Sequence, residues 1–321
     1  MKILVLGAGA IGGYFGGRLV QAGGDVAFLV RERRAQQLRN GLVVRSPHGD
    51  FTVPVRCVLQ SQLDAPFDLV VLTCKAYDLE AAIEAIAPAV GASTCIVPLL
   101  NGVAHIERLI AAFDAARLAG GSCAIPATLT EQGEVVQLGT FHSIVFGRLP
   151  GTSADMQPKL EALRRLYAKT PVPVELTDDM TTALWEKFVG LATLAAMTCL
   201  MRAPIGAILD TDDGPALVAE AFDACRRAAE AAGSPPGAAA LERFGAMLTD
   251  RTSTLTASML RDLESGGRTE GAHIVGDMLR RAEAAGVDPG PLRAAWCHLQ
   301  AAEGIRARKA AQASAATGSG R

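Results

Sequence analysis

The chain has 321 residues, enough for about two domains of ordinary size. Half of its residues are hydrophobic, 20% are charged, and the formal net charge is −2. This balance supports a large buried core and gives no electrostatic basis for binding nucleic acid or an anionic membrane.

Seven cysteines and five histidines are scattered along the chain, with no C-x-x-C pair and no H-E-x-x-H spacing. The odd number of cysteines argues against a disulfide framework, so we expect small buried core residues in a reducing cytoplasm and no structural metal. Lys2 followed by apolar residues superficially matches a signal peptide, but a glycine pattern in the same residues explains them better.

The first 31 residues predict a strand, a glycine-rich turn, a helix over 11–22 and a second strand over 25–30. In a G-x-G-x-x-G turn at this place, Gly7 allows the tight turn, Gly9 lets a diphosphate approach the backbone, and Gly12 lets helix and strand pack closely. The free N–H groups at the start of the helix favour the negative charge. The predicted cofactor-binding residues of the turn are Gly7, Ala8, Gly9, Ala10, Ile11 and Gly12.

The residue after the second strand selects the cofactor. Where an acid would accept from a ribose 2′-hydroxyl, this chain has Arg31, whose guanidinium suits a 2′-phosphate. Arg33 and Arg34 follow, and Glu32 is the only acid in the patch. The alternative is a solvated basic start of a helix. The pattern favours NADP(H) over NAD.

The remainder of the first half alternates strands with helices. We predict a helix over 33–40, strands over 41–46, 51–55, 67–73 and 94–99, a helix over 76–87, and extended segments over 118–130 and 134–138 joined by a turn. A helix over 154–168 and a strand over 173–176 close this half. Near-continuous apolar strands separated by helices predict a parallel sheet covered on both faces.

From residue 178 onward the pattern is helical. Helices are predicted over 179–200, 214–232, 237–250, 252–265, 268–285 and 289–307. The uncharged run 188–201 is too short to cross a bilayer and predicts a buried helix. The fold class is therefore an α/β Rossmann-type dinucleotide-binding domain over 1–177 followed by an all-α C-terminal domain over 178–310. A tail over 311–321 lacks apolar bulk and is expected to be disordered.

Three further residues could carry chemistry. Lys75 and Asn101 follow predicted strands, where open α/β sheets bind ligands, although a salt-bridged lysine and a turn or cap asparagine are equally compatible with the local sequence. Lys187 lies beside the uncharged run in the helical half. It either snorkels to the surface or projects into a cleft.

These motifs, in this order, resemble the ketopantoate reductase (2-dehydropantoate 2-reductase) family over about residues 1–307. The matching pieces are G-A-G-A-I-G-G, Arg31, Thr73-Cys74-Lys75, Asn101-Gly102, residues 127–129, Leu184-Trp185-Glu186-Lys187, Ser258-Met259-Leu260 and Thr269-Glu270. Each piece is weak by itself, whereas their joint order and spacing are specific.

The resemblance implies NADPH-dependent reduction of a 2-oxo acid, as in pantothenate biosynthesis. It makes Lys187 the general acid, with Glu270 orienting that lysine and the nicotinamide ribose. The implied contacts are the substrate carboxylate for Ser258, cofactor and substrate for Asn101, the phosphate side for Lys75, and a cofactor contact through backbone for Ala127.

Family members that reduce ketopantoate typically carry asparagines where this chain has Leu191 and Ala195, and a further one at about Ile205. Loss of these amides removes hydrogen-bond donors and leaves part of the pocket apolar, which should weaken binding of a small hydroxylated acid. The substrate is therefore either ketopantoate or a related, more apolar 2-oxo acid.

Two other functions remain open. A non-catalytic NADP-binding regulator or scaffold would explain the lost asparagines, but it has no need for both Lys187 and Glu270. A dehydrogenase working in the oxidative direction is the third reading. We expect a small-molecule substrate and neither nucleic acid nor membrane as a partner, and the alanine-rich helices are compatible with a homodimer.

Overall fold

The computed structural model describes residues 1–318, and their side chains through residue 312. The chain forms two compact units, of which the first comprises Met1–Leu184 and the second begins at Trp185. The division falls inside a helix, seven residues later than the predicted boundary after residue 177. Met180 explains the difference, because it is fully buried and a Cβ on Gly120 would approach its side chain to 2.5 Å. The first turn of that helix therefore belongs to the first core.

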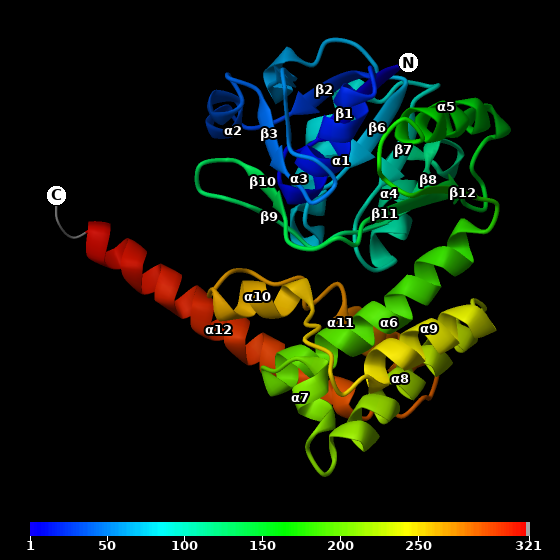
Figure 1. Cartoon of the computed structure of the whole chain (residues 1–321), viewed down its shortest axis with the longest axis vertical. Coiled ribbons are helices and arrows are strands. Elements are labelled where there is room, and N and C mark those ends of the chain that lie inside the picture. The colour runs from blue at the N-terminus through cyan, green and yellow to red at the C-terminus, as the bar shows by residue number, and fades with distance from the viewer. Residues whose placement is uncertain (319–321) are drawn as a thin grey trace. The chain divides into compact units, whose positions relative to one another are not determined.

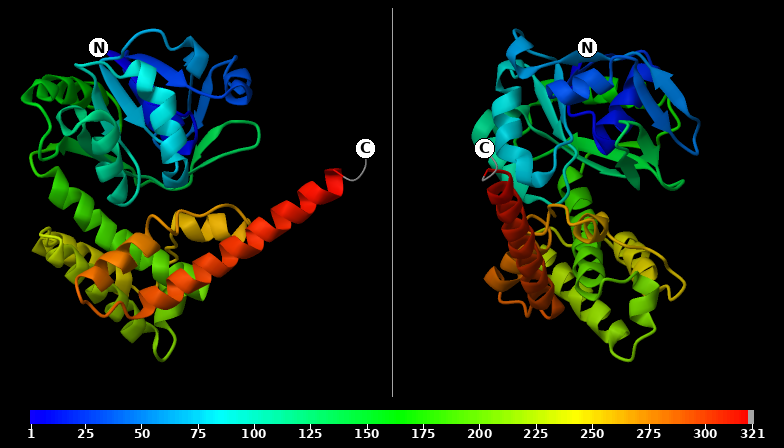
Figure 2. Two further views of the ribbon diagram at one scale, coloured as in Figure 1. Left: turned by 180° about the vertical axis from the view of Figure 1, so that it is seen from behind. Right: turned by 90° about the vertical axis from the view of Figure 1, so that its left-hand side faces the viewer.

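The first unit is built on a five-stranded parallel sheet with the order β5-β2-β1-β6-β7 (Figure 1). Its strands are β1 (Lys2–Leu6), β2 (Asp25–Leu29), β5 (Arg56–Val58), β6 (Leu69–Leu72) and β7 (Cys95–Pro98). Its helices are α1 (Ala10–Gln21), α2 (Glu32–Gln37), α3 (Leu79–Ile86), α4 (Ala104–Phe113) and α5 (Gln157–Tyr167). The chain runs from β1 to β2 in one direction and from β6 to β7 in the other, so right-handed crossovers put α1 and α3 on opposite faces (Figure 2). The predicted parallel sheet is confirmed.

Two smaller sheets complete the first unit. One has the order β4-β3-β10-β9 and the other β12-β11-β8. Their strands are β3 (Leu42–Arg45), β4 (Phe51–Val53), β8 (Ala119–Ala124), β9 (Ala127–Leu129), β10 (Val135–Gln137), β11 (Ser143–Arg148) and β12 (Val174–Thr177). The predicted extended segment 118–130 is interrupted at Pro126, which carries no N–H for a sheet ladder. The sequence analysis missed β5 and β11. Short 3₁₀ turns lie at Gln60–Gln62, Ala76–Asp78, Ala87–Ala89, Ala115–Arg117 and Ala154–Met156.

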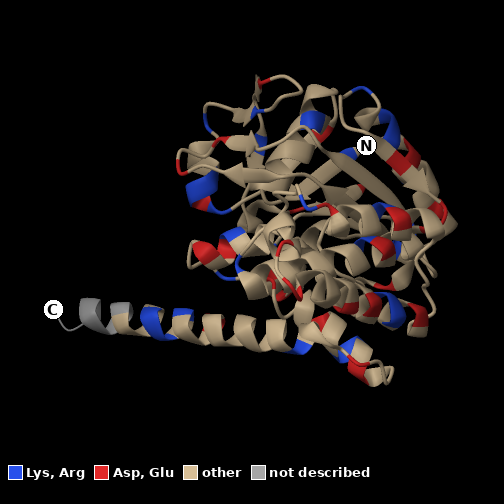
Figure 3. Cartoon of the chain, turned by 60° about the horizontal axis from the view of Figure 1, so that its bottom comes forward, with Lys and Arg blue, Asp and Glu red and all other residues tan. Residues whose placement is uncertain are grey.

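The second unit is all-helical, as predicted. Its helices are α6 (Met180–Met201), α7 (Ile205–Leu209), α8 (Gly214–Ala231), α9 (Ala238–Thr249), α10 (Ser258–Glu264), α11 (Val275–Ala284) and α12 (Pro291–Gly318). Figure 3 shows acidic and basic residues interspersed along the chain.

Three helical predictions differ from the structure. The predicted helix 252–265 begins only at Ser258. The segment before Ser258 is extended, and its Ser253 and Leu255 carbonyls accept hydrogen bonds from N–H groups at the start of α7. Helix α7 itself was not predicted. The predicted helix 268–285 begins at Val275. Helix α12 continues to Gly318 and so includes residues 311–318 of the segment that we expected to be disordered, where alanine and glutamine favour a helix. Residues 319–321 lie outside the described residues.

Helix α6 is the one helix of the described chain that is long and apolar enough to cross a membrane by length and composition. Most of its apolar window is buried inside the structure, with Phe188 and Met197 almost fully covered. This is the pattern of a core helix, as predicted for the run 188–201.

Candidate functional site

The turn between β1 and α1 has the geometry that its glycines predict. Gly7 has a φ of +90°, a conformation that L side chains rarely adopt. A Cβ on Gly12 would collide with the Gly7 carbonyl oxygen and the Thr73 hydroxyl. A Cβ on Gly9, in contrast, would meet no heavy atom within 4 Å. Gly12 is thus required for packing, whereas Gly9 faces open space at the start of α1.

The register of the sheet aligns the carboxyl ends of its central strands. Leu6 pairs with both Leu29 and Leu72, and Leu72 pairs with Pro98. The turns that follow β1, β6 and β7 therefore lie at one edge, at the point where the strand order reverses. The glycine-rich segment follows β1, and the Thr73-Cys74-Lys75 segment follows β6. Asn101 lies in the turn after β7. The Thr73 hydroxyl donates to the Leu6 carbonyl oxygen at 2.7 Å and ties two of these turns together.

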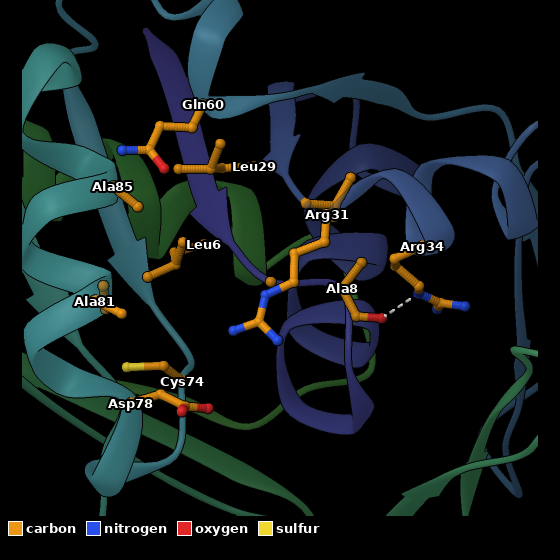
Figure 4. A pocket seen from close by; sticks show the side chains of 13 residues that line it. Leu6, Ala8, Leu29, Arg31, Arg34, Gln60, Cys74, Asp78, Ala81 and Ala85 are labelled. Atoms are coloured by element: carbon orange, nitrogen blue, oxygen red, sulfur yellow. Dashed lines mark hydrogen bonds between the residues drawn. The ribbon is translucent and has the colours of Figure 1, made fainter. Parts of the chain in front are cut away.

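A pocket of about 380 Å³ opens at this edge (Figure 4). It is lined by Leu6, Gly7, Ala8, Leu29, Val30, Arg31, Arg34, Gln60, Cys74, Asp78, Ala81, Ala82 and Ala85. The side chain of Arg31 is exposed and extends into the pocket between the glycine-rich turn and α3. The mostly apolar lining with one projecting guanidinium suits the adenosine part of a dinucleotide with a charged group on its ribose. The sequence analysis did not find Gln60 or Asp78, because neither belongs to a motif.

Arg34 differs from Arg31 in its surroundings. Its Nε donates to the Ala8 carbonyl oxygen at 2.8 Å, and its Nη1 donates to the Gly133 carbonyl oxygen at 2.8 Å and to Gln37 Oε1 at 3.2 Å. Burial lowers the pKa of the Arg34 guanidinium. In the basic patch predicted around Arg31, the Arg31 guanidinium is therefore exposed, whereas the Arg34 guanidinium donates hydrogen bonds to backbone carbonyls.

The remaining predicted residues of the first unit lie outside this pocket. Lys75 precedes the 3₁₀ turn after β6, and its carbonyl accepts from the Asp78 N–H at 2.9 Å. Ala127 is the first residue of β9 and pairs with Gln137 of β10. The structure therefore gathers Gly7, Ala8 and Arg31 in one pocket and places the others on neighbouring turns and strands. No group of three or more His, Cys, Asp or Glu side chains in the described part of the chain could hold a metal ion.

In the second unit, α6 carries Lys187 and is fixed by its neighbours. The Glu186 carboxylate accepts from the Gly237 N–H at 3.0 Å, at the start of α9, while the Arg281 guanidinium lies 5.3 Å from the centre of the Trp185 ring. Lys187 itself is half-buried. A half-buried lysine on a helix that is anchored on both sides has a restricted position, which a proton donor requires.

Glu270 and Ser258 lie in the loop-rich part of the second unit. Glu270 is 5% exposed and precedes α11, and its backbone carbonyl accepts from the His273 and Ile274 N–H groups. Ser258 is exposed and begins α10. The preceding Ala257 N–H donates to the Thr198 hydroxyl at 3.3 Å, which ties this loop to α6.

The positions where asparagines were expected differ in accessibility. Ala195 and Ile205 are both 0% exposed, whereas Leu191 is half-buried and lies one helical turn after Lys187. Residues four apart share a helix face, so Leu191 lies on the face of Lys187. Leu191 is therefore the one of the three that a ligand could contact without rearrangement of the core.

Comparison with known proteins matches both units to the same protein family. Residues 3–151 match the family described as ketopantoate reductase PanE/ApbA, and residues 179–302 match its C-terminal part. An uncharacterized oxidoreductase of Bacillus subtilis, YkpB, is 33% identical over 94% of this chain and 98% of its own length. The 2-dehydropantoate 2-reductase of Archaeoglobus fulgidus is 29% identical over 89% of this chain and 92% of its own. The crystal structure of 2-dehydropantoate 2-reductase from Geobacter metallireducens superposes with a TM-score of 0.83 at 30% identity, covering 94% of this chain and all of that one.

Proposed function

Because the chain belongs to the ketopantoate reductase PanE/ApbA family, we propose that it reduces the carbonyl of a 2-oxo acid to a 2-hydroxy acid with NADPH. The observation that carries the proposal is the pocket at the carboxyl edge of the sheet, where Gly7, Ala8 and Arg31 meet. This combination suits a dinucleotide whose ribose bears a 2′-phosphate. We place such a reductase in the reducing cytoplasm, which the odd number and the scatter of its seven cysteines favour.

NADPH supplies the hydride when bound, and the residues of this chain hold the reactants and move the proton. The turn from Gly7 to Gly12 would hold the diphosphate, and Arg31 the 2′-phosphate. Lys187 would give its ammonium proton to the carbonyl oxygen as the carbonyl carbon receives the hydride, and solvent would restore that proton. The positive charge of the lysine would also stabilise the alkoxide that develops.

Further residues would position the reactants. We assign the orientation of Lys187 to Glu270, and the substrate carboxylate to Ser258. Asn101 would contact cofactor and substrate, Lys75 the phosphate side, and Ala127 the cofactor through its backbone. Their place on turns and strand ends at the carboxyl edge of the sheet supports the assignments of Lys75 and Asn101.

The substrate is 2-dehydropantoate or a related, more apolar 2-oxo acid, and Leu191 is the residue that bears on this choice. An aliphatic side chain on the Lys187 face of α6 offers no hydrogen bond to a substrate hydroxyl. The half-burial of Leu191 therefore favours a substrate with an apolar group near its carbonyl.

The test is a steady-state assay that follows NADPH absorbance, with ketopantoate beside a panel of bulkier, apolar 2-oxo acids. Turnover on ketopantoate above ~10⁴ M⁻¹s⁻¹ would identify a pantothenate-pathway enzyme. Turnover on an apolar acid instead would identify a reductase with a changed pocket, and Leu191→Asn should then shift the ratio of kcat/KM values toward ketopantoate by about tenfold. Tight NADPH binding without turnover on any acid would contradict the proposal and indicate a non-catalytic NADP-binding protein.

A further inference from the structure

Arg34 links three segments of the first unit through donated hydrogen bonds. Its guanidinium joins the glycine-rich turn at the Ala8 carbonyl, the hairpin between β9 and β10 at the Gly133 carbonyl, and α2 through Gln37 (Figure 4 shows the first of these bonds). We propose that Arg34 is a positioning residue for the nucleotide diphosphate. It would hold the Ala8–Gly9 peptide in the orientation that presents the N–H groups of the turn to the ligand. This inference rests on the proposed dinucleotide binding.

The direction of a single peptide group carries the argument. In a trans peptide the C=O and N–H bonds point to opposite sides, and residues 1–318, which the structure describes, contain no cis peptide bond. Since the Arg34 Nε–H donates to the Ala8 carbonyl oxygen at 2.8 Å, that carbonyl points toward Arg34 and the Gly9 N–H points away from it. On Gly9 a Cβ would meet no heavy atom within 4 Å, so the backbone there is open to an approaching phosphate. The adjoining N–H groups at the start of α1 have no partner within the helix.

The charge of Arg34 supports the same role. Its side chain is half-buried, its pKa is lowered by burial, and no carboxylate is paired with it in the described part of the chain. Its Nη2 is buried without a hydrogen-bond partner among the described residues. A desolvated cation that contacts only neutral groups is costly, and a nearby anion offsets that cost. A bound diphosphate would supply this negative charge on the far side of the Ala8–Gly9 peptide.

The same contacts distinguish Arg34 from a ligand of the 2′-phosphate. Nε and Nη1 are occupied by backbone carbonyls and Nη2 is covered, whereas Arg31 is exposed in the pocket. A positioning residue for the diphosphate should affect NADPH and NADH equally, because both carry that diphosphate. A residue that binds the 2′-phosphate should affect NADPH only.

The experiment compares dissociation constants of NADPH and NADH, measured by nucleotide fluorescence, for the full chain and its variants. Arg34→Met removes the donors while keeping a long side chain, and we expect both nucleotides to bind about tenfold more weakly, with their ratio unchanged. Arg31→Met should weaken NADPH alone. Arg39→Met is the matched control, because Arg39 is exposed beyond the end of α2 and its loss changes the net charge equally.

The outcomes distinguish a positioning role of Arg34 from binding of the 2′-phosphate and from an effect of net charge. The proposal would be overturned if the dissociation constants of Arg34→Met for both nucleotides stayed within about twofold of the parent values. It would also be overturned if only the affinity for NADPH fell. If Arg34→Met does not fold, Arg34→Lys keeps the charge and one donor, and it should still weaken both nucleotides in parallel. An equal loss in Arg39→Met would attribute the effect to net charge and also overturn it. Failure of the parent protein to bind either nucleotide would instead refute the proposed function.

Discussion

At the scale of single residues, two glycines of one motif have separate physical tasks. A side chain on Gly12 would collide with the Gly7 carbonyl and the Thr73 hydroxyl, whereas a side chain on Gly9 would enter open space. Gly12 is therefore needed for packing, and in the proposed function Gly9 leaves room for the diphosphate. Their substitutions should therefore fail in different ways.

We expect Gly9→Ala to unfold at the temperature of the parent but to lose NADPH affinity by at least tenfold, because its methyl group would stand where the diphosphate approaches. Gly12→Ala should lower the free energy of unfolding by about 1–3 kcal/mol, because helix and strand must move apart. Thermal unfolding combined with nucleotide titration separates the two effects. A Gly9→Ala protein that binds NADPH normally would contradict the assignment of this turn to the diphosphate.

At the scale of elements, α1 is joined to the segment after β10 through a buried histidine. The Tyr14 hydroxyl and His142 Nδ1 are 2.6 Å apart, and the His48 ring stacks on His142 with ring centres 3.9 Å apart. Burial lowers the pKa of His142, and the nearby His48 and Arg18 add to this effect. The folded state therefore disfavours the protonated form of His142.

The stability of the protein should then depend on pH in a defined direction. In the unfolded chain a histidine takes up a proton near pH 6.5, whereas folded His142 resists protonation to lower pH. Below about pH 6.5 the unfolded state binds more protons, so the free energy of unfolding should decrease as the pH falls. His142→Gln should make this decrease shallower in urea unfolding measured from about pH 7 to pH 5. An identical pH dependence in the variant would exclude His142 as its source.

A second link between elements concerns α6 and the loop before α10. The Thr198 hydroxyl donates to the Leu194 carbonyl at 2.7 Å and accepts from the Ala257 N–H at 3.3 Å, next to Ser258. Thr193 is equally buried on the same helix and donates to the Val189 carbonyl at 2.9 Å. Only the first threonine fixes the residue before the proposed carboxylate ligand, so the second provides a matched control.

Thr198→Val should raise KM for the 2-oxo acid about fivefold with little change in kcat, because the loop loses one hydrogen bond. Thr193→Val should leave KM near its parent value even if the free energy of unfolding falls. Thr198→Ser, which keeps the hydroxyl, should have a KM close to that of the parent. Equal KM values in the two valine variants would show that Thr198 has only a structural role.

At the scale of the whole molecule, periodicity and the glycine motif predicted the parallel sheet and the helical second half. They did not predict contacts between distant segments. The hydrogen bond from Arg34 to Ala8 and the Asp78 side chain in the pocket depend on how α2, α3 and β6 pack, and no local pattern encodes this packing. The limits of α10 depended likewise on carbonyl groups that bond to α7. Local sequence specified the elements, while tertiary hydrogen bonds determined where they end.

In the proposed function, the residues that hold the phosphates of NADPH and the lysine that donates the proton belong to different units of the chain. The residues proposed to hold the diphosphate and the 2′-phosphate of NADPH lie before Leu184, and Lys187 lies after it. Lys187→Ala should thus reduce kcat by at least ~100-fold while the NADPH dissociation constant stays within about twofold. Lys187→Arg keeps the charge but is a poor acid, so it should also lose turnover if proton donation matters more than charge. Single-turnover rates and nucleotide titration on both variants measure this directly. Full turnover in Lys187→Ala would refute the general-acid role, and high turnover in Lys187→Arg would assign the lysine to electrostatic stabilisation of the alkoxide.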